Sequence, residues 1–321
     1  MEVTSEQLIE YLRLGRWLQS PEVISAFATV DRALFVPELL RRAAYLDQPL
    51  QVGPMHISAP FVYALALESL QIEPNLRFLN IGSGTGYFSA LAHRLIGNGG
   101  ANHAIEIKLE VIEQARANIH ALEERLGERI DIMFVLGNGL ALQSKEPYDR
   151  IYVGAGCKLN DVFMEALFPL LKCPGGILVA PFEGYLKRIV RVSRTEFQSR
   201  NLARAHFASI QPVTAVDRRH PPRLPAKVWS PDSHCTFPDM FKCLIFWVLL
   251  VAKRQDSLPV GIWCEILSYL HCSDVSEKFR SCAVFESMMS KKPNATHSNT
   301  GGIASGLEEN INCAQISCVI C

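Results

Sequence analysis

Short apolar runs and longer amphipathic runs alternate through the middle of the chain. The apolar runs predict buried strands, and the amphipathic runs predict helices that hide one stripe of their surface. The predicted strands are residues 77–81, 102–107, 130–136, 150–154 and 176–182. The predicted helices between them are residues 85–96, 108–126 and 160–172. This alternation indicates an α/β fold, a doubly wound Rossmann-like parallel sheet covered by helices on both faces.

The segments on either side of this core have their own patterns. Residues 4–45 predict N-terminal helices, one of them starting at Ser20 as N-cap with Pro21 in its first turn. Two strand-like runs, 186–194 and 202–210, extend the sheet at its edge. After Val213 the chain becomes charged and proline-rich, which favours a linker over a regular element.

The same shift in composition divides the chain into four predicted parts. Two apolar helical candidates, 237–253 and 258–271, follow the linker, and small polar residues dominate the end of the chain. We therefore expect a main domain over 1–214, a linker over 215–234, a small helical appendage over 235–286 and a disordered tail over 287–321.

Composition narrows the class of function. Lys+Arg and Asp+Glu both total 32, so no basic excess points to nucleic acid or an anionic membrane as the partner. Of ten cysteines, only Cys157 and Cys173 precede residue 230, and their spacing does not fit a zinc site. We expect no metal, reduced thiols and a cytoplasmic protein, because the first residues also lack the pattern of a signal peptide.

A glycine-rich turn follows the first predicted strand of the core. Gly82, Gly84 and Gly86 alternate between that strand and a helix, which lets the backbone approach a ligand at the N-terminus of the helix. Twenty residues later, Glu106 ends the next strand, where an acid can accept hydrogen bonds from ribose hydroxyls. The spacing differs from that of a dinucleotide loop. A nucleoside cofactor without phosphates fits better, and S-adenosyl-L-methionine is the common one.

Several separated motifs carry a family resemblance. They are Asp31–Pro37, Ala44–Leu50, Ile57–Pro60, Phe78–Gly86, Pro147–Ala155 and Leu171–Gly176. Over roughly residues 5–212 the chain resembles protein-L-isoaspartate O-methyltransferases, and within them the isoaspartate O-methyltransferase domain-containing subgroup. The resemblance implies methyl transfer from S-adenosyl-L-methionine to the free carboxylate of isoaspartyl residues in damaged proteins.

The resemblance also implies roles for individual residues. Ser58 would hold the substrate carboxylate, with Ile57, Ala59 and Pro60 forming the rest of the substrate-side motif. The cofactor would be bound by Asn80, Gly82, Ser83, Gly84, Gly86, Glu106 and Asn138, with Gly137–Gly139 against the adenine. Two other interpretations stay open: Ser58 could simply cap the helix over 59–70, and His56 fits a residue at the solvent edge better than a base.

Some residues depart from the pattern of the resembled family. Asn80 and Asn138 stand where typical active members carry aspartates, and Phe61 and Tyr63 stand where they carry histidines. Cofactor binding is therefore more strongly indicated than turnover. The alternative to an enzyme is a substrate receptor of a cullin-RING ubiquitin ligase that recognises isoaspartyl damage.

The C-terminal segment bears on that alternative. The resembled subgroup carries a helical box that recruits elongins and a cullin, and Thr236–Ile245 loosely fits such a SOCS box, while Leu258–Leu270 looks as much like an F-box. Residues 237–271 could equally pack on the main domain. Co-purification with elongin–cullin components, compared with a chain that ends at residue 230, separates these cases.

A lipid anchor is the remaining hypothesis for the end of the chain. Cys318–Cys321 fits a prenylation pattern, with Cys313 as a second acylation site. Prenylation of Cys318 would attach the protein to a membrane by lipid alone.

Overall fold

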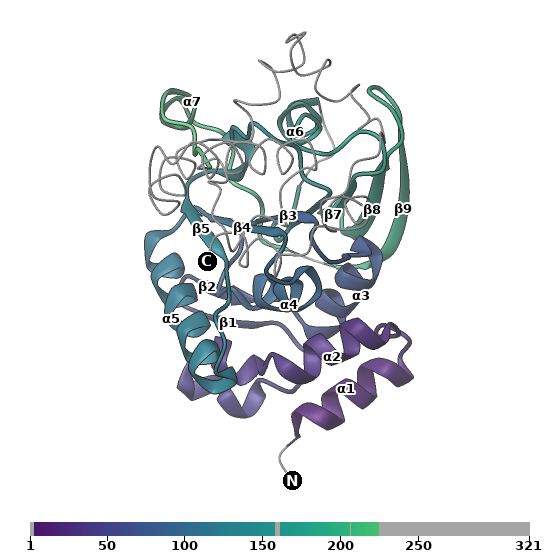
Figure 1. Ribbon diagram of the computed structural model, residues 1–321. Coiled ribbons are helices and arrows are strands. Elements are labelled where there is room, and N and C mark those ends of the chain that lie inside the picture. Colours follow the sequence, from purple (N-terminus) through teal and green to yellow (C-terminus); the bar gives the residue numbers. More distant parts are fainter. Residues whose placement is uncertain (1–2, 158–160, 206, 225–321) are drawn as a thin grey trace, which may run out of the picture. The chain divides into compact units, whose positions relative to one another are not determined.

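The computed structural model describes residues 3–157, 161–205 and 207–224. Its main sheet is built from strands β3 Arg77–Ile81, β4 Ala101–Glu106, β5 Met133–Leu136, β6 Arg150–Val153, β7 Ile177–Phe182, β8 Tyr185–Arg191 and β9 Phe197–Arg204. Among the described residues these strands lie in the order β5-β4-β3-β6-β7-β8-β9 (Figure 1). Strands β3 to β7 are parallel, and β8 and β9 run antiparallel at one edge.

Helices cover both faces of this sheet, as the alternating pattern predicted. Successive strand residues point to opposite faces, so Phe78 and Tyr152 join one apolar core, whereas Leu79 and Ile151 join the other. The first core is shared with residues of α3 Pro60–Leu70, α4 Tyr87–Ile96 and α5 Leu109–Leu126, and the second with residues of α6 Asp161–Leu167.

The N-terminal residues form a further layer outside α3 and α4 (Figure 1). This layer consists of α1 Ser5–Leu14, α2 Pro21–Thr29 and the 3-10 turns η1 Arg32–Phe35 and η2 Glu38–Ala43. Because α3 lies between this layer and the sheet, it is mostly apolar, and eight of its eleven residues are buried.

Ser20 occupies the predicted N-cap position of α2, but its side chain does not cap the helix. The Ser20 hydroxyl instead donates to Glu68 of α3, which also accepts from the backbone N–H groups of Gln19 and Ser20. One carboxylate therefore ties the start of α2 to the neighbouring helix.

Three smaller elements complete the described chain: the hairpin β1 Leu50–Val52 and β2 Met55–Ile57, the 3-10 turn η3 Gly139–Ala141, and the short helix α7 Ala215–Arg219. Helix α7 lies where the sequence predicted only a linker, and its start is stabilised by a reciprocal cap between Thr214 and Asp217. Strand β9 begins five residues before the predicted run 202–210. Most of its residues are exposed, so no apolar pattern marked its start.

Three of the sequence predictions fall outside the described residues. The helical segment 235–286, the tail 287–321 and the lipid site Cys318 all lie beyond residue 224. No helix in the described part of the chain combines the length and the apolar character needed to cross a bilayer.

Candidate functional site

A cavity of about 220 Å³ opens at the carboxyl ends of β3, β4 and β6. That volume is several times the roughly 30 Å³ of a single liquid water, so the cavity suits a ligand better than one trapped solvent molecule. Its position is the edge at which open parallel sheets bind ligands. It is lined by residues that include His56, Ser58, Tyr63, Asn80, Gly82, Ser83, Gly84, Phe88, Glu106, Lys108, Gly137, Asn138, Tyr152 and Gln211.

The predicted glycine turn forms one wall of this cavity. Gly82 and Gly84 both have positive φ angles, +74° and +56°, which glycine adopts without strain. The backbone N–H groups of Gly82 and Ser83 donate to the carbonyl of Ile105 at 2.8 and 3.0 Å, which attaches the turn to the end of β4.

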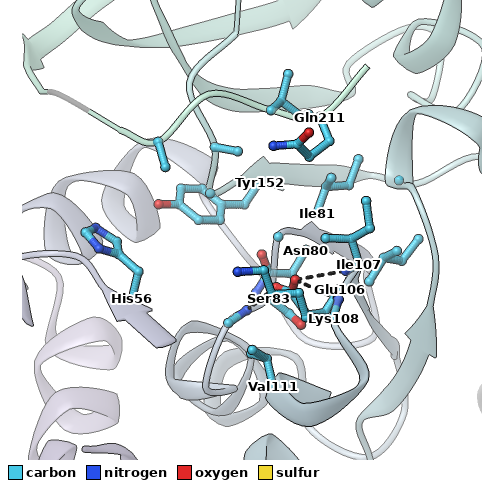
Figure 2. Close-up of a pocket in the computed structure, with 18 of the residues that line it drawn as sticks. His56, Asn80, Ile81, Ser83, Glu106, Ile107, Lys108, Val111, Tyr152 and Gln211 are labelled. Atoms are coloured by element: carbon cyan, nitrogen blue, oxygen red, sulfur yellow. Dashed lines mark hydrogen bonds between the residues drawn. The ribbon is translucent and has the colours of Figure 1, made fainter. Parts of the chain in front are cut away.

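Glu106 fixes the same turn through its side chain (Figure 2). Its Oε2 accepts from the N–H of Gly84 at 3.1 Å, and its Oε1 accepts from the N–H groups of Ile107 and Lys108 at 2.8 and 3.3 Å. Each carboxylate oxygen has two lone pairs, so Oε2 retains capacity for a ligand hydroxyl. The predicted pairing of the glycine turn with Glu106 is present in the structure.

Three polar atoms in the cavity lack hydrogen-bond partners among the described residues: Asn80 Oδ1, Ser83 Oγ and Tyr152 Oη. All three are buried, and buried polar atoms in native proteins are nearly always paired. The amide of Asn80 is anchored from its other end, because Nδ2 donates to Ser89 Oγ of α4 at 2.9 Å. Its Oδ1 is therefore an acceptor available to a ligand with N–H groups.

These features fit the amino-acid and ribose ends of S-adenosyl-L-methionine. Asn80 Oδ1 offers an acceptor for an ammonium group, Glu106 offers one for ribose hydroxyls, and the glycine backbone leaves room for close approach. The acceptor groups of this cavity thus match the cofactor predicted from the sequence.

Ser58 also lines the cavity and is held through its backbone. Its N–H donates to the hydroxyl of Tyr63 at 3.0 Å, and its carbonyl accepts from the buried guanidinium of Arg32 at 2.9 Å. The interpretation of Ser58 as the helix cap is wrong, because Ala59 is the N-cap of α3. His56 lines the cavity as well, with its carbonyl 3.2 Å from where a Cβ on Gly84 would lie, and partial burial lowers the pKa of its imidazole.

Asn138 lines the cavity, but its amide is engaged by the chain itself. Its Oδ1 accepts from the N–H of Leu140, while Nδ2 donates to the carbonyls of Gln211 and Pro212 at 3.3 and 3.1 Å and lies 3.4 Å from Asp217 Oδ2. An aspartate here could not donate these bonds. Asn138 thereby holds a C-terminal segment against the cavity.

That segment, residues 207–223, is here called the C-terminal strap. Its residues 208–211 line the cavity, and Gly156 fastens it through hydrogen bonds with the Ala208 carbonyl and the Ile210 N–H at 2.7 and 2.8 Å. At its far end Pro222 packs so closely on Gly137 that a Cβ there would lie 2.4 Å from Pro222 Cγ. The strap was not predicted from the sequence.

Other predicted site residues lie outside the cavity lining. Gly86 is the N-cap of α4, where a Cβ would meet Phe134 and Ala115, so it permits helix packing. The remaining ones, outside the lining as well, are Ile57, Ala59 and Pro60. Of the N-terminal part that the structure describes, the β1–β2 hairpin and α3 contribute to the lining, through Pro54, His56 and Tyr63, whereas α1 and α2 do not.

Tyr152 also lines the cavity, although no part in the site was predicted for it from the sequence. It belongs to a motif that was noted only for its family resemblance, although its place near the carboxyl end of a parallel strand could have marked it. In the described ranges no group of three or more His, Cys, Asp or Glu side chains is arranged to hold a metal ion.

Comparisons with known proteins agree on one family. The family model for protein-L-isoaspartate(D-aspartate) O-methyltransferase matches residues 3–219. A protein-L-isoaspartate O-methyltransferase of Methanothrix thermoacetophila is 36% identical over 191 residues, covering 59% of this chain and 85% of the relative. One of Ignicoccus hospitalis is 36% identical over 185 residues, covering 57% and 83%.

A solved structure shares the fold. It is the crystal structure of a candidate protein-L-isoaspartate O-methyltransferase from Plasmodium falciparum in complex with S-adenosyl-L-homocysteine. The match has a TM-score of 0.56 and 22% identity, and covers 65% of this chain and 99% of that one.

Proposed function

The chain belongs to the protein-L-isoaspartate(D-aspartate) O-methyltransferase family, and from this premise we propose that it methylates isoaspartyl residues of damaged proteins. The methyl group comes from S-adenosyl-L-methionine and is transferred to the free carboxylate of the isoaspartyl residue. The cavity at the carboxyl ends of β3, β4 and β6 is the site of this reaction.

The cofactor's place in the cavity follows from the polar groups there. Glu106 takes the ribose, Asn80 Oδ1 takes the ammonium group, and the backbone of Gly82 to Gly84 lies against the amino-acid end. When bound, the cofactor supplies a methyl group already activated by a positively charged sulfur.

The side chains of the site have to align the substrate carboxylate with the methyl group. An isoaspartyl carboxylate is already ionised at neutral pH, so no general base is required, and correct placement of the carboxylate provides most of the rate enhancement. Ser58 is suited to this task because Tyr63 and Arg32 fix its backbone on both sides. The neutral form of His56, favoured by its lowered pKa, leaves no positive charge there to repel the sulfonium.

The observation that carries this proposal is the convergence of unpaired buried polar atoms with the Glu106–glycine cradle in one cavity. A radiolabelled methyl-transfer assay tests it, with the full chain, S-adenosyl-L-methionine, and an isoaspartyl peptide beside its normal aspartyl counterpart. We expect label on the isoaspartyl peptide alone.

Replacing Ser58 should then weaken the reaction. Loss of one hydrogen bond to a charged group costs about 1.5–3 kcal/mol, so Ser58→Ala should lower kcat/KM by about 10- to 100-fold. Ser25→Ala, on the exposed surface of α2, is the matched control and should leave the rate unchanged. Equal labelling of both peptides by the natural chain would refute the proposed substrate.

Two finer statements rest on sequence patterns alone. The cytoplasm as the place of action is supported by the cysteine usage, and the adaptor hypothesis by the loose SOCS-box and F-box likeness within residues 235–286. The family match ends at residue 219, before the segment that the adaptor hypothesis concerns.

A further inference from the structure

The hydroxyl of Tyr152 is a buried polar group that the proposed site does not yet use. Tyr152 is 1% exposed, and its Oη has no hydrogen-bond partner among the described residues. It sits opposite Asn80 in the parallel register of β3 and β6, and its ring stacks on Phe88 with centroids 4.0 Å apart. The ring is therefore held firmly by packing.

A phenylalanine would satisfy this packing better than a tyrosine. Burying an unpaired hydroxyl destabilises a protein, since the group gives up its hydrogen bonds to water. The hydroxyl is also a lasting donor, because burial raises the pKa of Tyr152 well above its usual value. The unpaired hydroxyl lowers the stability of the ligand-free protein and lines a ligand cavity. Its presence is best explained by a hydrogen bond to an acceptor atom of a bound ligand.

The Tyr152 hydroxyl is directed toward the substrate-side residues of the cavity, which follow His56 along the chain. Figure 2 shows it directed toward His56, away from Glu106 and Lys108. The Phe88 ring also contacts that of Tyr63, at a centroid distance of 5.3 Å, and the Tyr63 hydroxyl accepts from the Ser58 N–H. The Tyr152 hydroxyl, unlike that of Tyr63, has no partner among the described residues, and its proton is therefore left to donate on the side of the cavity where His56 lies.

We propose that Tyr152 is a substrate-binding residue whose hydroxyl donates a hydrogen bond to the isoaspartyl carboxylate. This inference rests on the proposed function, and it divides the cavity by chemistry. Asn80 Oδ1 and Glu106 are acceptors and suit the ammonium and hydroxyl donors of the cofactor, whereas the tyrosine O–H suits an anionic acceptor.

Binding, measured without turnover, tests the assignment. The full chain is saturated with S-adenosyl-L-homocysteine, and an isoaspartyl peptide is titrated into the natural chain, Tyr152→Phe and Tyr185→Phe. The last is a matched control, because the Tyr185 hydroxyl contacts Arg204 on β9, outside the cavity lining. We expect Tyr152→Phe to weaken peptide binding about 10-fold or more, the usual effect of losing a hydrogen bond to a charged group.

Two further measurements distinguish a substrate-binding role of the hydroxyl from a structural role. Tyr152→Phe should keep the dissociation constant of S-adenosyl-L-homocysteine within about twofold, and its melting temperature without ligand should be equal to or higher than that of the natural chain. A lower melting temperature would mark the hydroxyl as structural and overturn the assignment.

The remaining outcomes are distinct. Unchanged peptide affinity in Tyr152→Phe, with binding intact in the natural chain, overturns the assignment and leaves the proposed function standing. Weakened binding of S-adenosyl-L-homocysteine instead shows that the hydroxyl serves the cofactor, which also overturns it. If the natural chain binds no isoaspartyl peptide, the proposed function fails and this inference fails with it.

Discussion

Two asparagines distinguish this cavity from the pattern of the resembled enzymes, which carry aspartates there. The structure shows what each amide group does. Asn80 uses its N–H to reach Ser89 and leaves its oxygen to the cavity, and Asn138 uses its N–H groups to hold the C-terminal strap. The site therefore keeps its acceptor atoms but lacks two negative charges next to the place of a cationic cofactor.

The charge at position 80 can be restored. Asn80→Asp should tighten binding of S-adenosyl-L-homocysteine by about 10-fold, because a carboxylate accepts from an ammonium group roughly twice as strongly as an amide does. The same change should lower the melting temperature of the ligand-free chain, since the side chain is 0% exposed and a buried carboxylate is poorly solvated. Calorimetry and thermal unfolding measure the two effects.

Asn118→Asp is the matched control for this change. Asn118 is also buried and donates to the Thr85 carbonyl, but it lies outside the cavity lining. It should lose stability without any gain in affinity. Equal or weaker cofactor binding in Asn80→Asp would show that the Asn80 oxygen does not face the ammonium group.

At the scale of elements, two segments outside the main sheet enclose the cavity. The β1–β2 hairpin brings His56 and, just beyond it, Ser58 to one side, and the C-terminal strap brings residues 208–211 to the other. The strap contacts the body of the domain at Gly156, at Asn138 and at Gly137. Its hold on Asn138 depends on a donor that an aspartate lacks.

Asn138→Asp should therefore loosen the strap. The new carboxylate would face two backbone carbonyls and the carboxylate of Asp217, all of them acceptors. We expect faster amide hydrogen exchange over residues 207–219 and weaker binding of S-adenosyl-L-homocysteine, by about 10-fold, from the loss of hydrogen bonds that hold part of the wall.

The double variant Asn138→Asp with Asp217→Asn is the test of mechanism. It exchanges the donor and the acceptor, so part of the slow exchange should return. The recovery should be only partial, because Asp217 Oδ2 also accepts from the Thr214 N–H and Oγ1, and an amide at 217 can serve either that cap or the new carboxylate at 138. Exchange rates in Asn138→Asp that match those of the natural chain would show that other contacts suffice to hold the strap.

At the scale of the whole domain, regular sequence patterns predicted the parallel strands and the glycine turn. Apolar runs located β3 to β7 within about three residues, and the glycine turn with Glu106 located the cofactor side of the cavity. The edge strand β9 was misplaced because its residues are mostly exposed. The strap, α7 and the free hydroxyl of Tyr152 were missed, because each depends on contacts between segments far apart in the sequence.

The proposed function and the proposed substrate role of Tyr152 both depend on binding of the cofactor in this cavity. Titration calorimetry of the full chain with S-adenosyl-L-homocysteine, with Glu106→Gln and Glu110→Gln beside it, measures that event directly. Glu110 is exposed in the first turn of α5 and is the matched control. An amide at 106 has one oxygen and cannot accept from both Gly84 and Ile107, so one of these bonds is lost, and the charged acceptor for the ribose is lost with the carboxylate.

We predict one molecule bound per chain, affinity unchanged in Glu110→Gln, and affinity reduced by about 10- to 100-fold in Glu106→Gln. Absence of binding to the natural chain, or equal affinity in Glu106→Gln, would contradict the account.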